Sequence, residues 1–521
     1  MQRALRIVLC VGTSFAQLFA QGQKLHHAPR REVTNQERLA PGPKSEDLLM
    51  RSYATGKQFV PDERAAHLVF LTQVAADANP EMARRWAEEA FKLTSDLPMS
   101  WNRGVAQRNV LVQLARVDPA RALQLLGSMD IPVPQVGGSL TEDLRASAAQ
   151  AVFLAAWRKT GAKNLGVMQR EAQHIGETGQ YPYKAMANII SGLAPRDSAR
   201  AHSLFSEALA YYRRGSKFRS TNLEYLEFLR EVRPYIQQSL VRSALEIFVA
   251  EVSKSPEPEK GENWVFQIET DKGVAALRSP AERLLFEVLP MIREIDAEWA
   301  QRIVDTRPQL RQASGTGARV QRVESALVKQ LPDSHSDERT ISQIEQHGLE
   351  MSRLRNIQAM ASEKPDEALT LSWSLTDPAL RTMALAQVAT SLSDKSPERA
   401  AKVFRTSEEL LGGLESPSDK LRALTAVAEA AAALGESESV RSALQQGFDL
   451  GEELFQEDVD QHPTKPAILS DAFKQLHKLT QLGIRVQSPG TLARLDSLRN
   501  EVLQGYLLIS AAQALQDLHR P

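Results

Sequence analysis

The sequence is poor in cysteine and in aromatic residues, and it has no excess of charge of either sign. It holds one cysteine among 521 residues, 6% Phe, Trp and Tyr, and a formal net charge of −1. With 63 Lys and Arg against 64 Asp and Glu, nothing draws the chain as a whole to nucleic acid, and we expect no nucleic-acid partner. A hydrophobic fraction of 42% excludes wholesale disorder and a multi-pass membrane protein.

The one cysteine, Cys10, falls in an N-terminal segment laid out like a secretory signal peptide. Arg3 and Arg6 precede an apolar run from Ile7 to Ala20, and the segment contains no acid. The run is too short to cross a bilayer as a permanent helix, so residues 1–20 predict a signal peptide, with an uncleaved anchor as the alternative. A cysteine in the middle of the apolar run is not placed for lipidation.

Cleavage of this segment, which we expect near Ala16–Gln21, has two consequences. The remaining chain would contain no cysteine, which excludes disulfides, thiolate metal sites and a cysteine nucleophile. It would also contain no integral membrane segment, and we expect a periplasmic or secreted location. Residues 21–45 are polar and contain proline, and they predict a disordered arm.

A short hydrophobic pattern recurs along the rest of the chain: an apolar pair, two free positions, and a second apolar residue that is usually followed by alanine. Copies start at Phe70, Val110, Ile189, Phe228, Leu284, Ala384 and Ala423. Positions i, i+1, i+4 and i+5 lie on one face of a helix, so each copy predicts a packing stripe. From these stripes we expect burial of Leu71, Leu111, Leu385, Val388, Leu424 and Val427.

The spacing of the copies points to a repeat. Phe70 and Val110 are 40 residues apart, and Ala384 and Ala423 are 39 apart. Proline opens a second helix between stripes, in Asn79-Pro80, Asp118-Pro119, Lys364-Pro365 and Ser396-Pro397. Proline suits the first helical position, and Asn, Asp or Ser before it can cap the helix. We therefore predict an all-α fold of antiparallel helix pairs that must stack to bury their apolar faces.

Over most of residues 46–521 these features resemble the α-solenoid class, the tetratricopeptide-like and HEAT-like helical-repeat proteins. The resemblance is architectural: no unit meets the tetratricopeptide pattern, and the repeat length fits HEAT repeats better. It implies an extended, partly concave surface that binds proteins or peptides.

Interruptions in the repeat predict how the chain is divided. We expect two helical-repeat regions, 46–312 and 338–521, joined by a linker or irregular turn over 313–337; a continuous superhelix is the alternative. Helix signals dominate throughout, and the one strand-like stretch is Trp264–Ile268, inside a loop-like segment.

Common catalytic motifs are missing. The sequence has no H-E-x-x-H, G-x-S-x-G, Ser-x-x-Lys or G-K-[ST], and no two of its ten histidines are four residues apart. We predict no metal site, no cofactor and no catalytic residue. The acidic run from Glu452 to Asp460 is interpreted as a solvated helix end rather than a cation site, because His462-Pro463 breaks the pattern of a calcium loop.

Tyrosines and bases gather in one place. Six of the eight tyrosines lie between residues 181 and 235. Within that stretch a cluster around a glycine is the candidate binding site: Tyr211, Tyr212, Arg213, Arg214, Lys217 and Arg219. Tyrosine and arginine suit recognition because they combine rigid area, hydrogen bonding and cation–π contact, and a partner here should be acidic. The alternative is a helix C-terminus whose tyrosines pack inward and whose bases are solvated.

Two classes of function remain open. The first is a non-catalytic protein- or peptide-binding scaffold exported into the bacterial envelope. The second is an exported carbohydrate- or cell-wall-active enzyme whose cleft is assembled from several helices. Sugar clefts need stacked aromatic rings, and the low aromatic content favours the scaffold.

Overall fold

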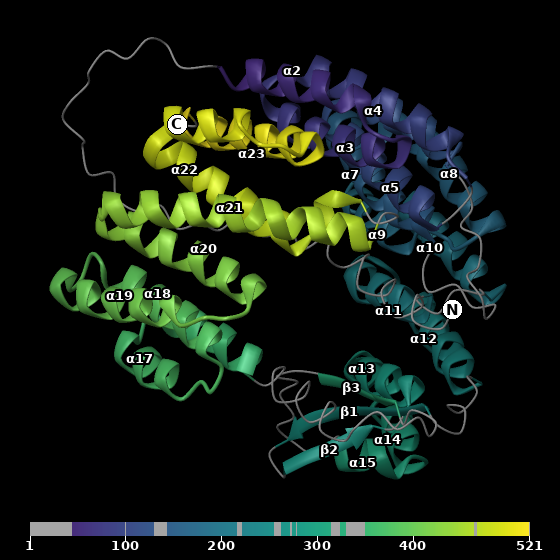
Figure 1. Cartoon of the computed structure of the whole chain (residues 1–521). Coiled ribbons are helices and arrows are strands. Elements are labelled where there is room, and N and C mark those ends of the chain that lie inside the picture. Colours follow the sequence, from purple (N-terminus) through teal and green to yellow (C-terminus); the bar gives the residue numbers. More distant parts are fainter. Residues whose placement is uncertain are drawn as a thin grey trace. The chain divides into compact units, whose positions relative to one another are not determined.

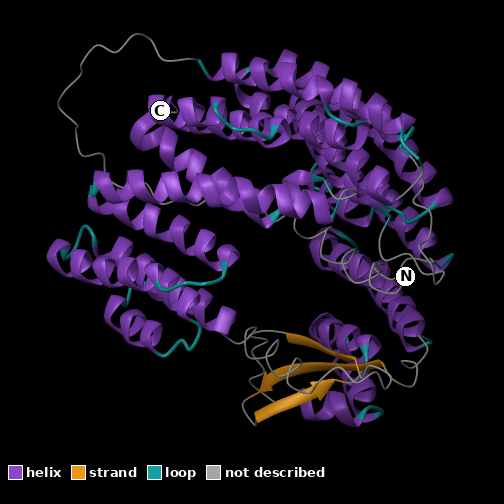
Figure 2. Cartoon of the chain, viewed as in Figure 1, coloured by secondary structure: helices purple, strands orange, loops and turns teal. Residues whose placement is uncertain are grey.

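A computed structural model describes residues 44–98, 101–129, 143–215, 221–254, 262–270, 273–277, 279–313, 324–329, 350–462 and 466–519. The expected signal peptide and almost all of the expected arm lie outside these residues. Figure 2 shows that helices dominate, with one small sheet. Among the described helices, none is long and apolar enough to cross a membrane.

The chain divides into two compact units. Of the described residues, unit 1 combines those from 44 to 97 with those from 350 to 519, and unit 2 contains those from 98 to 329. The division falls between the described residues 329 and 350, and the linker or irregular turn was expected at 313–337. The grouping of residues 46–97 with the C-terminal region was not expected, since the repeat pattern had placed them in one region with residues up to 312.

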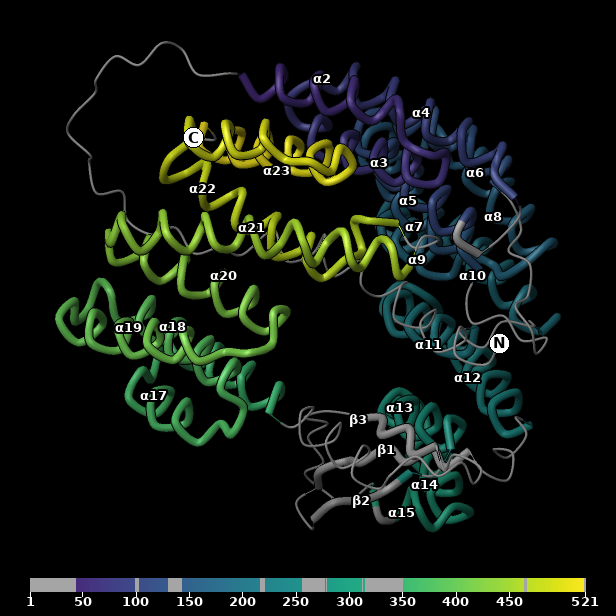
Figure 3. The backbone as a smooth tube through the Cα atoms, in the orientation of Figure 1, coloured from purple at the N-terminus to yellow at the C-terminus, as the bar shows by residue number. Residues whose placement is uncertain are grey.

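Unit 2 is a row of helices that are neighbours in both sequence and space (Figure 3). Its helices are α5 (Trp101–Val117), α6 (Pro119–Leu126), α7 (Leu144–Thr160), α8 (Leu165–Thr178), α9 (Tyr183–Leu193), α10 (Ser198–Arg213), α11 (Thr221–Val232), α12 (Gln238–Ser253), α13 (Pro280–Ile295), α14 (Ala297–Asp305) and α15 (Pro308–Ala313). Helices α5, α7, α9, α11 and α13 pack successively against one another, and α6, α8, α10 and α12 each pack against a member of that series. Alternate helices of unit 2 therefore pack on one another in chain order.

A three-stranded antiparallel sheet corrects the expectation of a purely helical fold. Its strand order is β2 (Gly273–Leu277), β1 (Glu262–Thr270), β3 (Glu324–Lys329). In β1, Phe266 lies opposite Leu277 of β2 and Ser325 of β3. The strand-like stretch 264–268 falls inside β1, whereas β3 falls inside the expected linker. A lone strand has no stability of its own, and the pairing of β1 with a strand some 60 residues away could not be read from local periodicity.

Unit 1 uses helices from both ends of the chain. The first are α2 (Ser45–Thr55), α3 (Pro61–Ala78) and α4 (Pro80–Asp96), and the others are the helical residues 350–360, α17 (Pro365–Trp373), α18 (Pro378–Leu392), α19 (Pro397–Gly412), α20 (Pro417–Leu434), α21 (Ser437–Gln461), α22 (Asp471–Asp496) and α23 (Glu501–His519). Helices α18, α20, α22 and α23 pack successively, and α23 then packs against α2 and α3 (Figure 1).

Buried polar contacts join the two segments of unit 1. The Ser52 hydroxyl of α2 donates to the carbonyl of Gly505 in α23 at 2.8 Å. The Glu63 carboxylate of α3 accepts a hydrogen bond from the Ala467 backbone N–H at 2.9 Å and another from the Tyr506 hydroxyl. Helix α23 is buried on nearly all sides, and α2 and α3 cover one of these sides. This packing is why residues 46–97 belong to unit 1.

The expected helix starts are confirmed in part. All four proline-led helices begin at the expected proline: α4, α6, α17 and α19. Asn79 accepts from the backbone N–H of Met82 at 3.1 Å, and Asp118 from that of Arg121 at 3.1 Å. Lys364 and Ser396 make no side-chain cap bond.

The expected core is confirmed. Leu71, Leu111, Leu385, Val388 and Leu424 are 0% exposed, and Val427 is 1% exposed. These residues lie on α3, α5, α18 and α20, so the stripe marks the packed face of the helices in both units.

Candidate functional site

The expected Tyr/Arg site starts at the end of α10 in unit 2, and the four of its six residues that the structure describes fall into three environments. Tyr212 points inward and is 3% exposed. Its ring stacks on Tyr225 with centroids 3.8 Å apart, and its hydroxyl donates to Asn222 Oδ1 at 2.9 Å. Burial raises the pKa of the Tyr212 hydroxyl, which therefore stays protonated. The expectation that Tyr212 anchors a partner is wrong, because its surface is already covered by the core of unit 2.

Tyr211 is half-buried and carries a cation. Its ring stacks on buried Tyr181 at 4.7 Å, and the Arg214 guanidinium lies over the Tyr211 ring at 4.7 Å from its centroid. The Tyr181 hydroxyl in turn lies 3.2 Å from Glu207 Oε1, whose other oxygen accepts from Gln169 and Gln173, each at 2.8 Å. These contacts fix the two stacked rings, and the fixed rings hold the Arg214 side chain.

Arg213 and Arg214 are exposed, and neither forms an ion pair within the part of the chain that the structure describes. Many other arginines do: Arg230 of unit 2 lies 3.1 Å from Glu287, and Arg242 lies 3.0 Å from Asp296. Lys217 and Arg219 fall outside the described residues. The structure therefore brings Tyr211 and Arg214 together, with Arg213 next to Arg214 in the chain, and both arginines are exposed to solvent.

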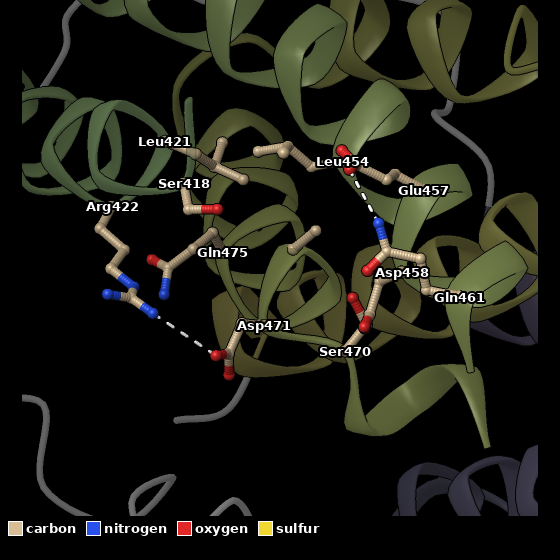
Figure 4. A pocket seen from close by; sticks show the side chains of 11 residues that line it. Ser418, Leu421, Arg422, Leu454, Glu457, Asp458, Gln461, Ser470, Asp471 and Gln475 are labelled. Carbon is tan, nitrogen blue, oxygen red and sulfur yellow. Dashed lines mark hydrogen bonds and ion pairs between the residues drawn. The ribbon is translucent and has the colours of Figure 1, made fainter. Parts of the chain in front are cut away.

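A polar hollow of about 260 Å³ lies between α20, α21 and α22 in unit 1 (Figure 4). Its lining includes Ser418, Arg422, Glu457, Asp458, Asp471 and Gln475. Sequence reasoning missed this site, although Glu457 and Asp458 belong to the acidic run that had been interpreted as a helix end. The run does end α21, at Gln461.

The carboxylates of the hollow all have partners on their own or neighbouring helices. Asp471 lies 3.4 Å from Arg422 and 2.7 Å from Lys474, and Gln461 donates to Glu457 at 2.9 Å. Asp458 lies 3.1 Å from His462 Nδ1. Each of its three carboxylates already accepts a hydrogen bond or lies in an ion pair, and the hollow is a weaker candidate than the two exposed arginines.

Unit 1 contains a serine–histidine contact, the kind of pairing that activates the serine nucleophile of hydrolases. Ser52 Oγ lies 2.8 Å from His67 Nε2. The single Ser52 proton is donated to the Gly505 carbonyl, so His67 must donate its Nε2–H to Ser52. Both side chains are 0% exposed, and burial lowers the pKa of His67 to about 3. A histidine that donates to the serine cannot deprotonate it, so this pair ties helices together instead of forming a nucleophile.

Among the described residues, no group of three or more His, Cys, Asp and Glu side chains is arranged to hold a metal ion. No known protein-family model matches the chain, and no curated protein matches it.

Proposed function

We propose that this protein is an exported, non-catalytic scaffold of the bacterial envelope, built as an α-solenoid, that binds an acidic protein or peptide at the C-terminal end of α10. The observation that carries the proposal is the Arg214 guanidinium held over Tyr211. Arg213 precedes it in the chain, and within the described residues neither arginine forms an ion pair. The successive packing of alternate helices in both units supports the solenoid architecture.

Stacking on the Tyr211 ring preorganises the Arg214 side chain for binding. A free arginine loses side-chain entropy when it binds, and part of that loss is already made when its guanidinium rests on a fixed ring. A planar guanidinium also binds a carboxylate with two parallel hydrogen bonds. Tyr211 is itself fixed by Tyr181, so the Arg214 guanidinium rests on a ring that does not move freely. Within the described residues, the charge of Arg214 is not paired with a carboxylate. A carboxylate of the partner is the ligand group that this arrangement fits.

The test measures binding of a fluorescent oligo-glutamate peptide to the full chain. We expect Arg213→Gln with Arg214→Gln to weaken binding about tenfold, equivalent to about 1.4 kcal/mol, and wild-type binding to weaken as salt rises. The matched control is Arg84→Gln with Arg85→Gln, which removes the same charge from two adjacent exposed arginines of α4. Equal losses in the two double variants would show that only net charge matters and would overturn the proposed site.

A further inference from the structure

His477 of α22 is a half-buried histidine whose tautomer is fixed by its neighbours. Its ring lies 6.0 Å from Phe70 and 5.9 Å from Phe473, and its Nδ1 lies 2.7 Å from Ser510 Oγ of α23. The Ser510 hydroxyl donates its one proton to the Tyr506 carbonyl at 3.1 Å. His477 must therefore donate Nδ1–H to Ser510, which leaves Nε2 with a lone pair.

The His477 ring is neutral, because its packing lowers the pKa of the imidazole to about 4. Within the described residues, no side chain or backbone group donates to Nε2. His477 thus presents a hydrogen-bond acceptor that the described part of the fold does not use.

One helical turn further along α22, a pair of amides forms a second hydrogen bond between side chains of α22 and α23. Gln481 Nε2 donates to Gln513 Oε1 of α23 at 3.2 Å, and both side chains are half-buried. That contact leaves Gln481 Oε1 as an acceptor and Gln513 Nε2 as a donor, with no other partner among the described residues. The three side chains together offer two acceptor atoms, His477 Nε2 and Gln481 Oε1, as well as N–H donors of the two amides, and none of the three is charged.

The spacing of His477 and Gln481 along α22 is close to the repeat of an extended peptide. His477 and Gln481 are four residues apart on a helix, a rise of about 6 Å. In an extended chain, backbone N–H groups on the same edge recur every second residue, at about 6.6 Å. A peptide lying along α22 can therefore donate one N–H to His477 Nε2 and another to Gln481 Oε1, while Gln513 Nε2 donates to a backbone carbonyl.

The neighbouring rings argue against a sugar as the ligand. Phe70, Phe473 and Tyr506 are buried, at 5%, 1% and 0% exposure, so none of them offers a free face on which a sugar could stack. We propose that His477, Gln481 and Gln513 form a surface of unit 1 that binds the main chain of an extended, uncharged peptide segment. This surface lies in the other unit from the arginine pair and recognises a different chemistry, so it does not depend on the proposed function.

The test follows the side-chain nitrogens by NMR in the full chain, labelled with ¹⁵N in histidine and glutamine. The probe is an uncharged peptide of alternating serine and threonine, blocked at both ends, at millimolar concentration. We expect His477 to be in the Nδ1–H form before the peptide is added. Addition should then shift the His477 Nε2 signal and the side-chain amide signals of Gln481 and Gln513.

Two controls make the test decisive. The same peptide methylated on alternate backbone nitrogens lacks the donated N–H groups and should bind about tenfold more weakly. The unmethylated peptide should bind the protein variant Gln481→Ala/Gln513→Ala about tenfold more weakly as well. Gln445→Ala/Gln446→Ala, on the exposed face of α21, should bind like wild type. An Nε2–H form of His477, equal binding of the methylated peptide, or shifts caused instead by methyl glucoside would each overturn the proposal. The tautomer is read on the unmutated protein, so this arm does not depend on how the variants fold.

Discussion

Unit 2 is made from one stretch of chain, whereas unit 1 is made from two stretches that a whole unit separates. In unit 2 the main aromatic contacts are local, as in Tyr212 with Tyr225 and Phe205 with Phe228. In unit 1 the buried Glu63–Tyr506 contact joins residues 443 positions apart. The same hydrophobic stripe occurs in both units. The comparison shows that a repeat specifies how each helix pair packs but does not specify where the stack ends.

Removing a core leucine from the stripe should change the free energy of unfolding the most. Leu385 is 0% exposed on α18, and Leu385→Ala should lower the free energy of unfolding by about 2–5 kcal/mol. Leu371→Ala, at a side chain 42% exposed on α17, is the control and should change it by less than about 0.5 kcal/mol. Urea denaturation followed by circular dichroism measures both. Similar values for the two variants would remove the stripe as the basis of the fold.

A smaller effect is expected where α21 and α22 approach closely. A Cβ added at Gly447 would lie 2.5 Å from Leu479 Cδ1 of α22. We expect Gly447→Ala to destabilise unit 1 by about 1–3 kcal/mol, because the well-packed leucine must move. A Cβ at Gly412, the last residue of α19, would meet nothing within 4 Å. Thermal melts should therefore show a lower Tm for Gly447→Ala and no loss for Gly412→Ala; the reverse order would mean that this helix contact is misplaced.

The smallest effect is a pH dependence that belongs to unit 1. The folded-state pKa of His67 is about 3, below its usual 6.5. Between these values the unfolded chain binds a proton that the folded chain does not, so stability falls as pH is lowered below 6.5. From pH 6.5 to 5.5 the loss is at most about 1.4 kcal/mol.

The matched variant for this prediction is His67→Gln, which can still donate to Ser52 but does not titrate. Glu63 has a raised pKa and contributes in the opposite sense, so its stabilising effect weakens as pH rises above its usual range. Taking the difference between wild type and His67→Gln at each pH cancels Glu63 and isolates His67. Denaturant unfolding with a flat difference across this pH range would contradict the buried, neutral histidine.

Local signals predicted the parts of the fold that local physics decides. Asn79 and Asp118 cap their helices as expected, and the stripe residues are buried, because capping and helix periodicity act within a few residues. The packing of α2 against α23 and the pairing of β1 with β3 depend on partners far away in the chain. Nothing near Ser52 or Glu63 distinguishes them from ordinary helix residues.

The candidate site shows the same division. Composition located the tyrosines and arginines, but it could not assign Tyr212 to the core and Tyr211 to the surface. Those two adjacent residues point about 100° apart on α10, and only the position of Tyr225 and Tyr181 decides which one is covered. His477 gave no signal at all, because its interest lies in the tautomer that Ser510 imposes from another helix.

Helices α2–α4 group with the C-terminal helices and not with the helices that follow them in sequence. Native-state hydrogen exchange tests it with two full-length variants: Leu476→Ala in α22 of unit 1 and Leu229→Ala in α11 of unit 2, both at side chains 0% exposed. We predict that Leu476→Ala lowers the protection of amides in α2 and α3 together with those of α20–α23, and that Leu229→Ala leaves α2 and α3 unchanged. If Leu229→Ala lowers the protection of α2 and α3 and Leu476→Ala does not, these helices fold with unit 2 instead.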